Sequence, residues 1–515
     1  MTCGACMTKK LLIIIKKYRF EILLACGIVT LYFTTRLLNL LILPIFADEA
    51  IYVRWAQVMR SEPSLRFLPL SDGKTPLFMW TLMLLLKFFS DPLFAGRLLS
   101  VLSGFGTLIG IWVLANYLFG RRVAYISAFL YAIVPYMFFF DRMALVDSYL
   151  NFWGVWSLFL SVLLVKTLRL DVAMILGMVI AGGVLTKPTG WFFLLNLPLS
   201  LLLFSFKKPY WGKLGQLFAL WLVSFFFVAL GYNILRLGEN FHLIALRNRD
   251  YTFTISEALG HPFDPFLTHL RYIWQWFGGF LTWPIFFAIF VGGVLSLWQR
   301  NLKGLVILLW AVTPLLVQAE IAKVFTARYL IFSATPLLIL SAVSINYVLG
   351  KLEAKYGRAS IVLVLVLIST LPAYFIGSFL IDPEKAPLPR SERIGYLEEW
   401  TAGQGIPEVA SYIRNRAKDG RQIVVGSEGS FGTPFNGLEI YLGDLANVRV
   451  FGRGGGGFDK VIGSLISSSK DQETYFVTNE SRKDFEDSRL KLIAKYPKAQ
   501  GPKGREHLLF YQVLP

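Results

Sequence analysis

Long apolar stretches, separated by short polar connections, follow one another along the first 380 residues of the chain. One helical crossing of a bilayer needs about 20 mostly apolar residues. Eleven stretches come close to this length, some of them short: 21–43, 97–118, 123–140, 148–165, 172–186, 188–206, 214–235, 272–298, 304–319, 329–350 and 359–379. The pattern predicts a polytopic α-helical membrane unit over residues 1–379, followed by a polar tail over residues 380–515.

Basic residues are concentrated in alternate connections between these stretches. The basic connections are 1–20, 119–122, 166–171, 207–213, 299–303 and 351–358. The positive-inside rule assigns such connections to the cytoplasm. We therefore expect a cytoplasmic N-terminus in a multi-pass cell membrane protein. The first long loop (44–96), the second long loop (236–271) and the tail would then lie outside the cytoplasm.

The first long loop contains two segments that are too short to cross the membrane. Residues 77–89 are apolar, but counting them as a span would place every later basic connection outside. In the segment before it, Ile51, Trp55 and Met59 share one helical face. We expect both segments to form juxtamembrane helices at the outer interface.

The tail has the alternating pattern of a small α/β domain. Residues 405–420 read as an amphipathic helix that ends at a glycine, and four short runs rich in β-branched and aromatic residues follow it. These runs are 421–429, 447–452, 473–481 and 507–515. Helices that alternate with strands favour a small sheet flanked by helices. We therefore predict an extracytoplasmic α/β domain over residues 380–515.

Composition excludes a soluble globule and a disordered chain. The sequence is 55% hydrophobic and only 16% charged, whereas soluble domains have about a quarter of charged residues. The net charge of +18 could suggest nucleic acid. The excess positive charge, however, lies almost entirely in the basic connections, so it reflects membrane topology. We expect the lipid bilayer, and no nucleic acid, as a partner.

Ionisable residues recur where the apolar stretches reach the outer rim. They are Asp48, Glu49, Lys74, Arg97, Asp141, Arg142, Asp147, Lys187 and Arg328. Any single one can be explained by snorkelling, by a salt bridge or by a helix cap. Because charges near membrane depth are costly, their convergence points to a site for a membrane-embedded anionic substrate. Arginine and lysine would neutralise a phosphate there.

Asp48 and Glu49 form the one adjacent carboxylate pair at this rim. They can cap a helix and complement its dipole. Alternatively, one of them is a general base whose pKa is raised by its neighbour and by partial desolvation. The residues alone leave both interpretations open.

At these residues the sequence resembles the polyprenyl-phosphate-sugar-dependent glycosyltransferases of the GT-C fold. The resemblance extends to bacterial relatives of protein O-mannosyltransferases and of lipid A aminoarabinose transferases, a group similar to glycosyltransferase family 39. It covers residues 30 to 340 and rests on short segments in a fixed order: "TTRLLNL…ADEAIYVRWAQ", "DGKTPLFMW", "GRLLSVLSG", "DRMALVDSYLNFW" and "LTKPTG…ARYLIFSATPLLIL".

The resemblance implies an inverting transfer of a sugar from a polyprenyl (dolichyl-type) monophosphate to a hydroxyl of a protein or glycolipid acceptor at the outer face. Asp48 would be the general base, and Glu49 would orient the acceptor. Four cations would bind the donor phosphate: Lys74, Arg97, Arg328 and Lys187. Asp141, Arg142 and Asp147 would support the site.

The sequence departs from the family pattern at the lysine segment. Thr75 stands where many relatives have proline, and Gly73 stands where aminoarabinose transferases have glutamate. Those enzymes also use a loop histidine at a metal site, and His242, His261 and His269 lie in the second long loop here. Without the glutamate, the sequence predicts no metal ligands, and a divalent cation is the one cofactor left open.

Two other functions compete with an enzyme. A transporter or flippase of a lipid-linked sugar would place its substrate near the middle of the membrane, commonly between inverted repeats. We see no internal repeat, and the ionisable residues gather at one rim. A membrane scaffold for the tail would leave that rim without a role. These features favour a glycosyltransferase.

Overall fold

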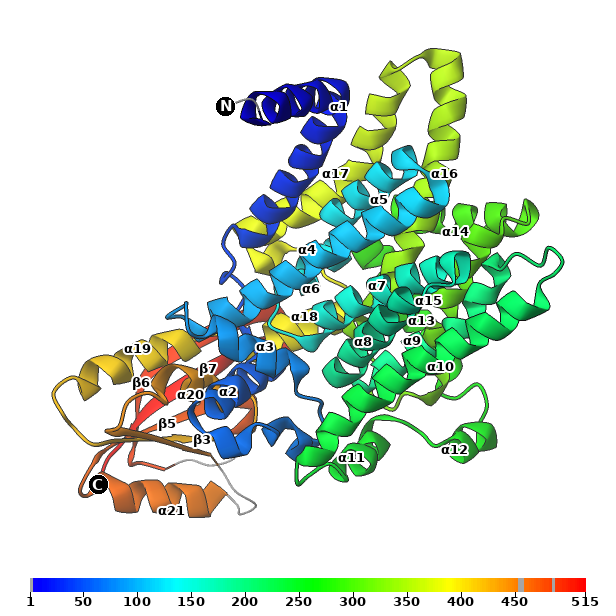
Figure 1. Cartoon of the computed structure of the whole chain (residues 1–515). Helices are drawn as coiled ribbons and strands as arrows, with labels where there is room; N and C mark the ends of the chain where they lie inside the picture. Colours follow the sequence, from blue (N-terminus) through cyan, green and yellow to red (C-terminus); the bar gives the residue numbers. More distant parts are fainter. Residues whose placement is uncertain (1–2, 453–457, 484–486) are drawn as a thin grey trace.

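The computed structural model describes residues 3–452, 458–483 and 487–515 (Figure 1). In this part of the chain, seven helices are long and apolar enough to cross a membrane, α1 from Lys17 onward. They are α1 (Cys3–Leu37), α4 (Pro92–Phe119), α7 (Val146–Thr167), α10 (Trp211–Asn233), α15 (Leu302–Ile321), α16 (Ile331–Tyr356) and α17 (Ala359–Ile381). The chain is therefore an integral membrane protein with a polytopic helical unit, as predicted.

The four remaining apolar stretches are helical but bent or short. Two bent pairs are α5 (Arg121–Ile133) with α6 (Pro135–Asp141), at 58°, and α13 (Phe266–Trp276) with α14 (Trp283–Trp298), at 116°. The shorter helices are α8 (Leu170–Thr186) and the run Pro188–Leu203 around α9 (Trp191–Leu195). A proline in the first turn of α6 and of α14 cannot continue the preceding helix. Residues 272–298 are thus not one straight span.

The two long loops are largely helical. The first contains α2 (Ala47–Ser61), the 3₁₀ turns η1 (Pro63–Leu65) and η2 (Leu68–Asp72), and α3 (Leu77–Leu85). With nine residues, α3 is too short to cross a membrane. The second contains α11 (Leu243–Tyr251) and α12 (Ile255–Gly260). The face of α2 that carries Ile51, Trp55 and Met59 is buried within the protein rather than laid on a lipid surface.

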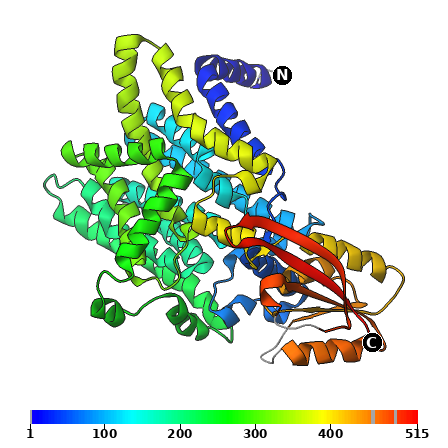
Figure 2. The ribbon, with the colours of Figure 1, turned by 180° about the vertical axis from the view of Figure 1, so that it is seen from behind.

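The tail folds around a five-stranded sheet in the order β4-β3-β5-β7-β6. The strands are β3 (Ile423–Ser427), β4 (Val448–Gly452), β5 (Glu473–Asn479), β6 (Leu490–Gly501) and β7 (Gly504–Val513). β3 pairs in parallel with β4 and β5, and β7 pairs antiparallel with β5 and β6. Helices α19 (Ile406–Ala417), α20 (Phe435–Leu442) and α21 (Phe458–Ser469) complete the predicted α/β domain. The β6–β7 hairpin is prominent in Figure 2, and β6 had no counterpart among the predicted strands.

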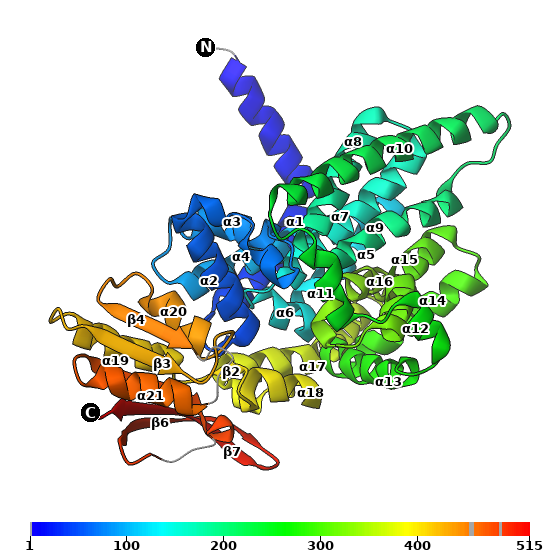
Figure 3. The same cartoon turned by 90° about the horizontal axis from the view of Figure 1, so that it is seen from below.

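The tail domain is attached to α2, beside which α20 lies in Figure 3. The Gln57 amide donates to the Ile440 carbonyl at 2.9 Å, and Arg54 pairs with Glu439 at 3.3 Å. A two-stranded ladder joins β1 (Ile45–Phe46) to β2 (Ala402–Gly403), which precedes α19. One continuous apolar core includes residues of both units. The tail domain therefore holds α2 at two places, through β2 just before the helix and through α20 along it.

Candidate functional site

A cavity of about 460 Å³ lies where the two long loops meet the ends of several membrane helices. Its walls come from the start of α2, the 72–75 segment, the start of α7, the α8–α9 connection, α11 and the end of α15. Its ionisable lining residues are Asp48, Asp72, Lys74, Asp147, Lys187, Arg247, Tyr52, Tyr251, Arg328 and Tyr329. Five of the predicted site residues are among them: Asp48, Lys74, Asp147, Lys187 and Arg328.

Asp48 points into this cavity rather than capping its own helix. The N-cap position of α2 is Phe46, and its backbone N–H donates to the Glu49 carboxylate at 3.0 Å. This leaves the side chain of Asp48 free to accept a hydrogen bond from Arg328 Nη2 at 2.5 Å. Asp48 retains 21% exposure, so a hydroxyl group in the cavity can reach its carboxylate.

Cations lower the pKa of Asp48. Burial alone would raise it, but the charges of Arg328, Lys74 and Lys187 outweigh burial and hold the pKa below its ordinary value. The expectation of a raised pKa is therefore wrong, because the neighbouring carboxylate of Glu49 is neutralised elsewhere. Burial also opposes the charge of Lys74, yet Tyr52, Asp48 and Asp72 together raise its pKa, so its ammonium stays charged.

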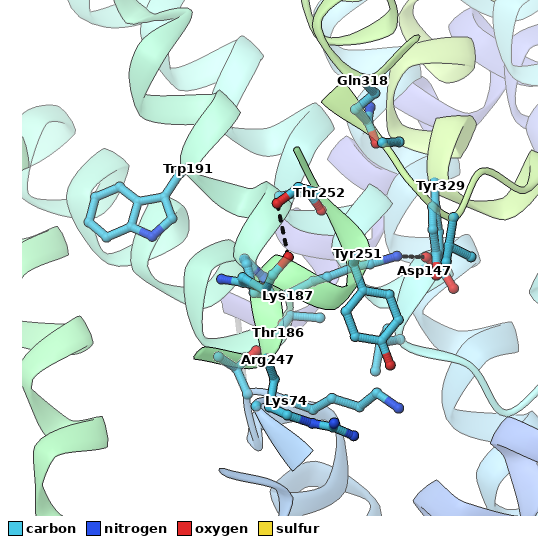
Figure 4. A pocket seen from close by; sticks show the side chains of 18 of the residues that line it. Lys74, Asp147, Thr186, Lys187, Trp191, Arg247, Tyr251, Thr252, Gln318 and Tyr329 are labelled. Atoms are coloured by element: carbon cyan, nitrogen blue, oxygen red, sulfur yellow. Dashed lines mark hydrogen bonds and ion pairs between the residues drawn. The ribbon is translucent and has the colours of Figure 1, made fainter. Parts of the chain in front are cut away.

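Asp147 links two further cations of the cavity. Its Oδ1 lies 2.6 Å from the ammonium of Lys187, and its Oδ2 lies 4.0 Å from Nε of Arg328. Figure 4 shows the Lys187 side chain extended toward Asp147. The ammonium of Lys187 also lies 3.7 Å from the ring centre of Tyr329. Lys187, Asp147, Arg328 and Asp48 thus form one continuous chain of alternating charges.

Lys74 belongs to a second charged group of the cavity. Two residues near it, Arg247 and Tyr251, were not indicated by the sequence. Asp72 lies 3.0 Å from Lys74 Nζ and 2.6 Å from Nη2 of Arg247, a residue of α11. Tyr251 of the same helix also lines the cavity (Figure 4). Gly73 has a φ of 69°, and a Cβ there would lie 2.5 Å from Cβ of Arg247. A glutamate at position 73 would displace Arg247.

Arg97 and Glu49 lie outside the cavity and are fully engaged with each other and with the backbone. Both oxygens of Glu49 accept two bonds each, from Arg97, Phe46 N–H and Ala144 N–H, at 2.7–3.0 Å. Arg97 donates its other hydrogens to the carbonyls of Leu40, Leu43 and Pro44. Its five N–H donors are thus all used, and neither side chain is exposed. The structure therefore does not bring Arg97 or Glu49 to the cavity, where phosphate binding and catalysis were expected of them.

Asp141 and Arg142 also lie away from the cavity. Arg142 donates to the carbonyls of Arg36, Leu38 and Asn39 at 2.6–2.8 Å and so caps the end of α1. Asp141 is buried 3.6 Å from Nε of Arg36. It accepts hydrogen bonds from three hydroxyl groups, those of Tyr32, Tyr131 and Ser148. Both residues stabilise helix packing instead of lining the cavity, and the ion-pair partner of Asp141 is Arg36.

The described residues do not assemble a metal site, because they contain no group of three His, Cys, Asp or Glu side chains. The Nδ1 atom of His269 lies 2.8 Å from the Ala319 carbonyl, and its ring stacks on Phe325. The Nδ1 atom of His261 lies 2.6 Å from the Asp264 carbonyl. These contacts are structural, so no step of the chemistry below is assigned to a metal.

Glu392, in the short helix α18 (Arg390–Arg393), holds the segment that carries Arg328. Its carboxyl accepts the Ala327 N–H at 3.2 Å and is buried. Burial raises its pKa to about 7, from 4.5, although Ala327 and Arg328 act in the opposite direction.

A pH-dependent stability follows from this shift. The folded state binds a proton at Glu392 more tightly than the unfolded state, so Glu392 should lower stability as pH rises from about 4.5 to 7, by up to about 3 kcal/mol. Glu392→Gln should remove this decline. Thermal unfolding of both proteins in detergent between pH 5 and 8 checks it, and parallel curves would contradict it.

One wall of the cavity is apolar. It includes Met79, Val146, Trp191, Phe192 and Leu195. Leu195 is 69% exposed, and it belongs to the short apolar run Pro188–Leu203. Charged and apolar side chains therefore line the cavity together, and Leu195 is exposed at the surface of an apolar helical run.

Comparisons with known proteins agree with this arrangement. Residues 73–229 match the family described as dolichyl-phosphate-mannose-protein mannosyltransferase. No curated protein sequence matches the chain.

Three solved structures share the architecture. ArnT from Cupriavidus metallidurans is 14% identical and covers 96% of this chain and 98% of its own, with a TM-score of 0.62 in the apo state and 0.59 bound to undecaprenyl phosphate. The oligosaccharyltransferase AglB from Archaeoglobus fulgidus, with an inhibitory peptide and a dolichol-phosphate, is 14% identical over 90% of this chain and 70% of its own, with a TM-score of 0.51. The chain therefore has the GT-C fold, and the family match within it indicates a membrane glycosyltransferase.

Proposed function

We propose that the protein transfers a sugar, with inversion, from a polyprenyl monophosphate to a hydroxyl of a protein or glycolipid at the outer membrane face. Asp48 is the general base of this reaction. Lys74, Lys187 and Arg328 bind the donor phosphate, and Asp147 positions Lys187 and Arg328. The N-terminus lies in the cytoplasm, and the tail domain lies outside it together with the cavity.

The observation that carries the proposal is that Arg328 is largely buried with one guanidinium nitrogen unpaired among the described residues. Its side chain is only 11% exposed, and among the described residues its Nη1 atom has no hydrogen-bond partner. A buried guanidinium nitrogen without a partner is costly. Because Arg328 lines the cavity, a turn of its guanidinium toward a phosphate oxygen there would supply that partner, and Lys187 and Lys74 lie around the same cavity to neutralise the remaining charge.

The reaction follows from the arrangement of these groups. The carboxylate of Asp48 takes the proton of the acceptor hydroxyl, whose oxygen forms a bond to the anomeric carbon of the sugar. The bond between that carbon and the phosphate oxygen breaks, and the electron pair leaves with the polyprenyl phosphate. Arg328, Lys187 and Lys74 stabilise the charge that develops on the leaving phosphate. Because this is a single displacement, the anomeric configuration inverts.

The apolar wall accounts for a lipid donor. The isoprenoid chain would lie along Trp191, Phe192 and Leu195, which belong to the apolar run Pro188–Leu203. The same fold binds undecaprenyl phosphate in the ArnT structure and a dolichol-phosphate with a peptide in the AglB structure. These ligands support a polyprenyl phosphate as the lipid carrier of the donor sugar and include a peptide among the candidate acceptors.

A transfer assay tests the function. Purified protein in detergent would receive polyprenyl-phosphate-linked hexoses and pentoses with hydroxyl-bearing peptides or glycolipids. We expect release of free polyprenyl phosphate and a product of inverted anomeric configuration. If donors instead cross vesicle membranes intact, and no sugar is released from any of them, the protein is a flippase and the proposal fails.

Replacement of Lys74 should weaken donor binding. Lys74→Met removes a charged partner of the phosphate, worth about 1.5–3 kcal/mol, so the donor KM should rise about 10- to 100-fold. Lys74 also helps to lower the pKa of Asp48, so the acidic limb of kcat/KM should move to higher pH. Steady-state kinetics across pH measures both effects.

Lys385→Met is the matched control, because that lysine is 78% exposed and pairs only with Asp382 in the described part of the chain. It should leave KM and the pH profile unchanged. An unchanged donor KM in Lys74→Met would remove Lys74 from the phosphate site.

A further inference from the structure

The loop that follows β3 in the tail domain lies beside the start of α2 and near Lys74. Glu428 anchors it, accepting hydrogen bonds from the hydroxyl of Thr478 at 2.8 Å and from the side-chain amide of Asn479 at 2.7 Å. At its other end, the Thr433 hydroxyl donates to the Trp400 carbonyl at 2.9 Å. Residues 428–433 are therefore fixed at both ends.

A close backbone approach brings this loop against α2. Gly432 has a φ of 75°, and a Cβ there would lie 3.3 Å from Cβ of Ala47, the residue before Asp48. The Gly432 N–H donates to Asn436 Oδ1 at 2.8 Å. The loop thus crosses from the sheet to the first turn of α2 in a defined conformation.

Phe431 stands on this loop and faces Lys74. Its ring lies 6.0 Å from that of Trp55, and the ammonium of Lys74 lies 5.6, 5.8 and 5.9 Å from the ring centres of Tyr52, Trp55 and Phe431. Phe431 remains 47% exposed, so core packing does not account for its position. Three aromatic rings and Asp72 therefore surround one ammonium group.

We propose that Phe431 is a positioning residue, through which the tail domain completes the donor-phosphate site by holding the ammonium of Lys74. This inference rests on the function proposed above. The faces of the three rings attract the cation without neutralising it, unlike a second carboxylate. The carboxylate of Asp72 orients the ammonium group, and the rings restrict the rotamers of the long Lys74 side chain before the phosphate binds. The membrane unit alone would lack this third ring.

Binding of undecaprenyl monophosphate in detergent micelles tests the inference without requiring catalysis. Phe431→Leu keeps apolar bulk against Trp55 but removes the ring, and it should raise the Kd for undecaprenyl monophosphate about 3- to 30-fold. Phe431→Tyr keeps a ring and should restore wild-type binding. In the transfer assay, Phe431→Leu should raise the donor KM with little change in kcat.

A double-mutant cycle separates positioning from a loss of structure. If Phe431 acts through Lys74, Phe431→Leu should have no further effect on Kd in a Lys74→Met background. Leu492→Ala, at a residue of the tail sheet that is 49% exposed, is the control and should leave Kd unchanged. Thermal unfolding should be the same for Phe431→Leu and wild type.

The outcomes distinguish the two proposals. If wild-type protein binds undecaprenyl monophosphate and Phe431→Leu binds it equally well, or if the two substitutions are additive, the positioning role is refuted while the function stands. If wild-type protein neither binds this lipid nor transfers sugar from a donor based on it, the proposed function fails and the inference fails with it.

Discussion

Asp48→Asn should abolish sugar transfer without unfolding the protein. The amide has almost the same shape as the carboxylate but cannot accept the proton of the acceptor hydroxyl. General base catalysis contributes about 10²- to 10⁴-fold, so we expect kcat to fall by about three orders of magnitude. The measurement is single-turnover release of polyprenyl phosphate, with thermal unfolding in detergent as the test of the fold.

Asp444→Asn is the matched control for this substitution. Asp444 is 63% exposed in the tail and pairs with Arg414. Its replacement should leave transfer unchanged. Transfer at the wild-type rate by Asp48→Asn would exclude Asp48 as the base. Asp147 would then be the carboxylate of the cavity to examine next, because it too lies beside Arg328.

Glu49→Gln should instead destabilise the fold, so that less folded protein is obtained. The substitution leaves the guanidinium of Arg97 buried with no counter-charge, and the N–H groups of Phe46 and Ala144 compete for one amide oxygen. Removing one partner of a buried ion pair costs about 3–5 kcal/mol. Yield of folded protein and its thermal unfolding temperature in detergent measure the effect.

Glu439→Gln serves as the comparison, because Glu439 pairs with Arg54, a residue of the same helix as Glu49. Its pair with Arg54 is partly exposed, so its removal should cost at most about 1 kcal/mol. If Glu49→Gln were as stable as wild type but inactive, Glu49 would have the acceptor-orienting role that the family resemblance implied, and the structural interpretation would be wrong.

The contrast between Asp48 and Glu49 shows what a sequence can predict here. Apolar stretches predict helices because length and hydrophobicity are local properties, and the helical membrane unit and the α/β tail followed from them. The sequence also indicated that charges gather at one rim. It could not indicate which of two adjacent carboxylates turns toward the cavity, because this depends on which backbone N–H groups at the start of α2 need an acceptor.

Arg97 and Arg142 lie away from the cavity for a related reason. The residues at the end of α1 and just after it have backbone carbonyl groups that need hydrogen-bond donors, and the two arginines supply these donors. A sequence shows the charge but not the carbonyls around it. Arg247, Tyr251 and Phe431 were missed because they come from polar segments far along the chain, where nothing distinguishes a residue that faces the cavity from one that faces solvent.

The ladder between β1 and β2 has a consequence for biosynthesis. The Ala47 N–H donates to the Thr401 carbonyl at 3.0 Å, and Ile45 and Phe46 pair with Gly403 and Ala402. The residues just before the proposed base thus take their final position only after residues 401–403 have been synthesised and have reached the same side of the membrane. A ribosome-bound chain that ends at α17 would contain every helix of the membrane unit and still be inactive. Activity would begin only after residues 401–403 have paired with the residues that precede α2.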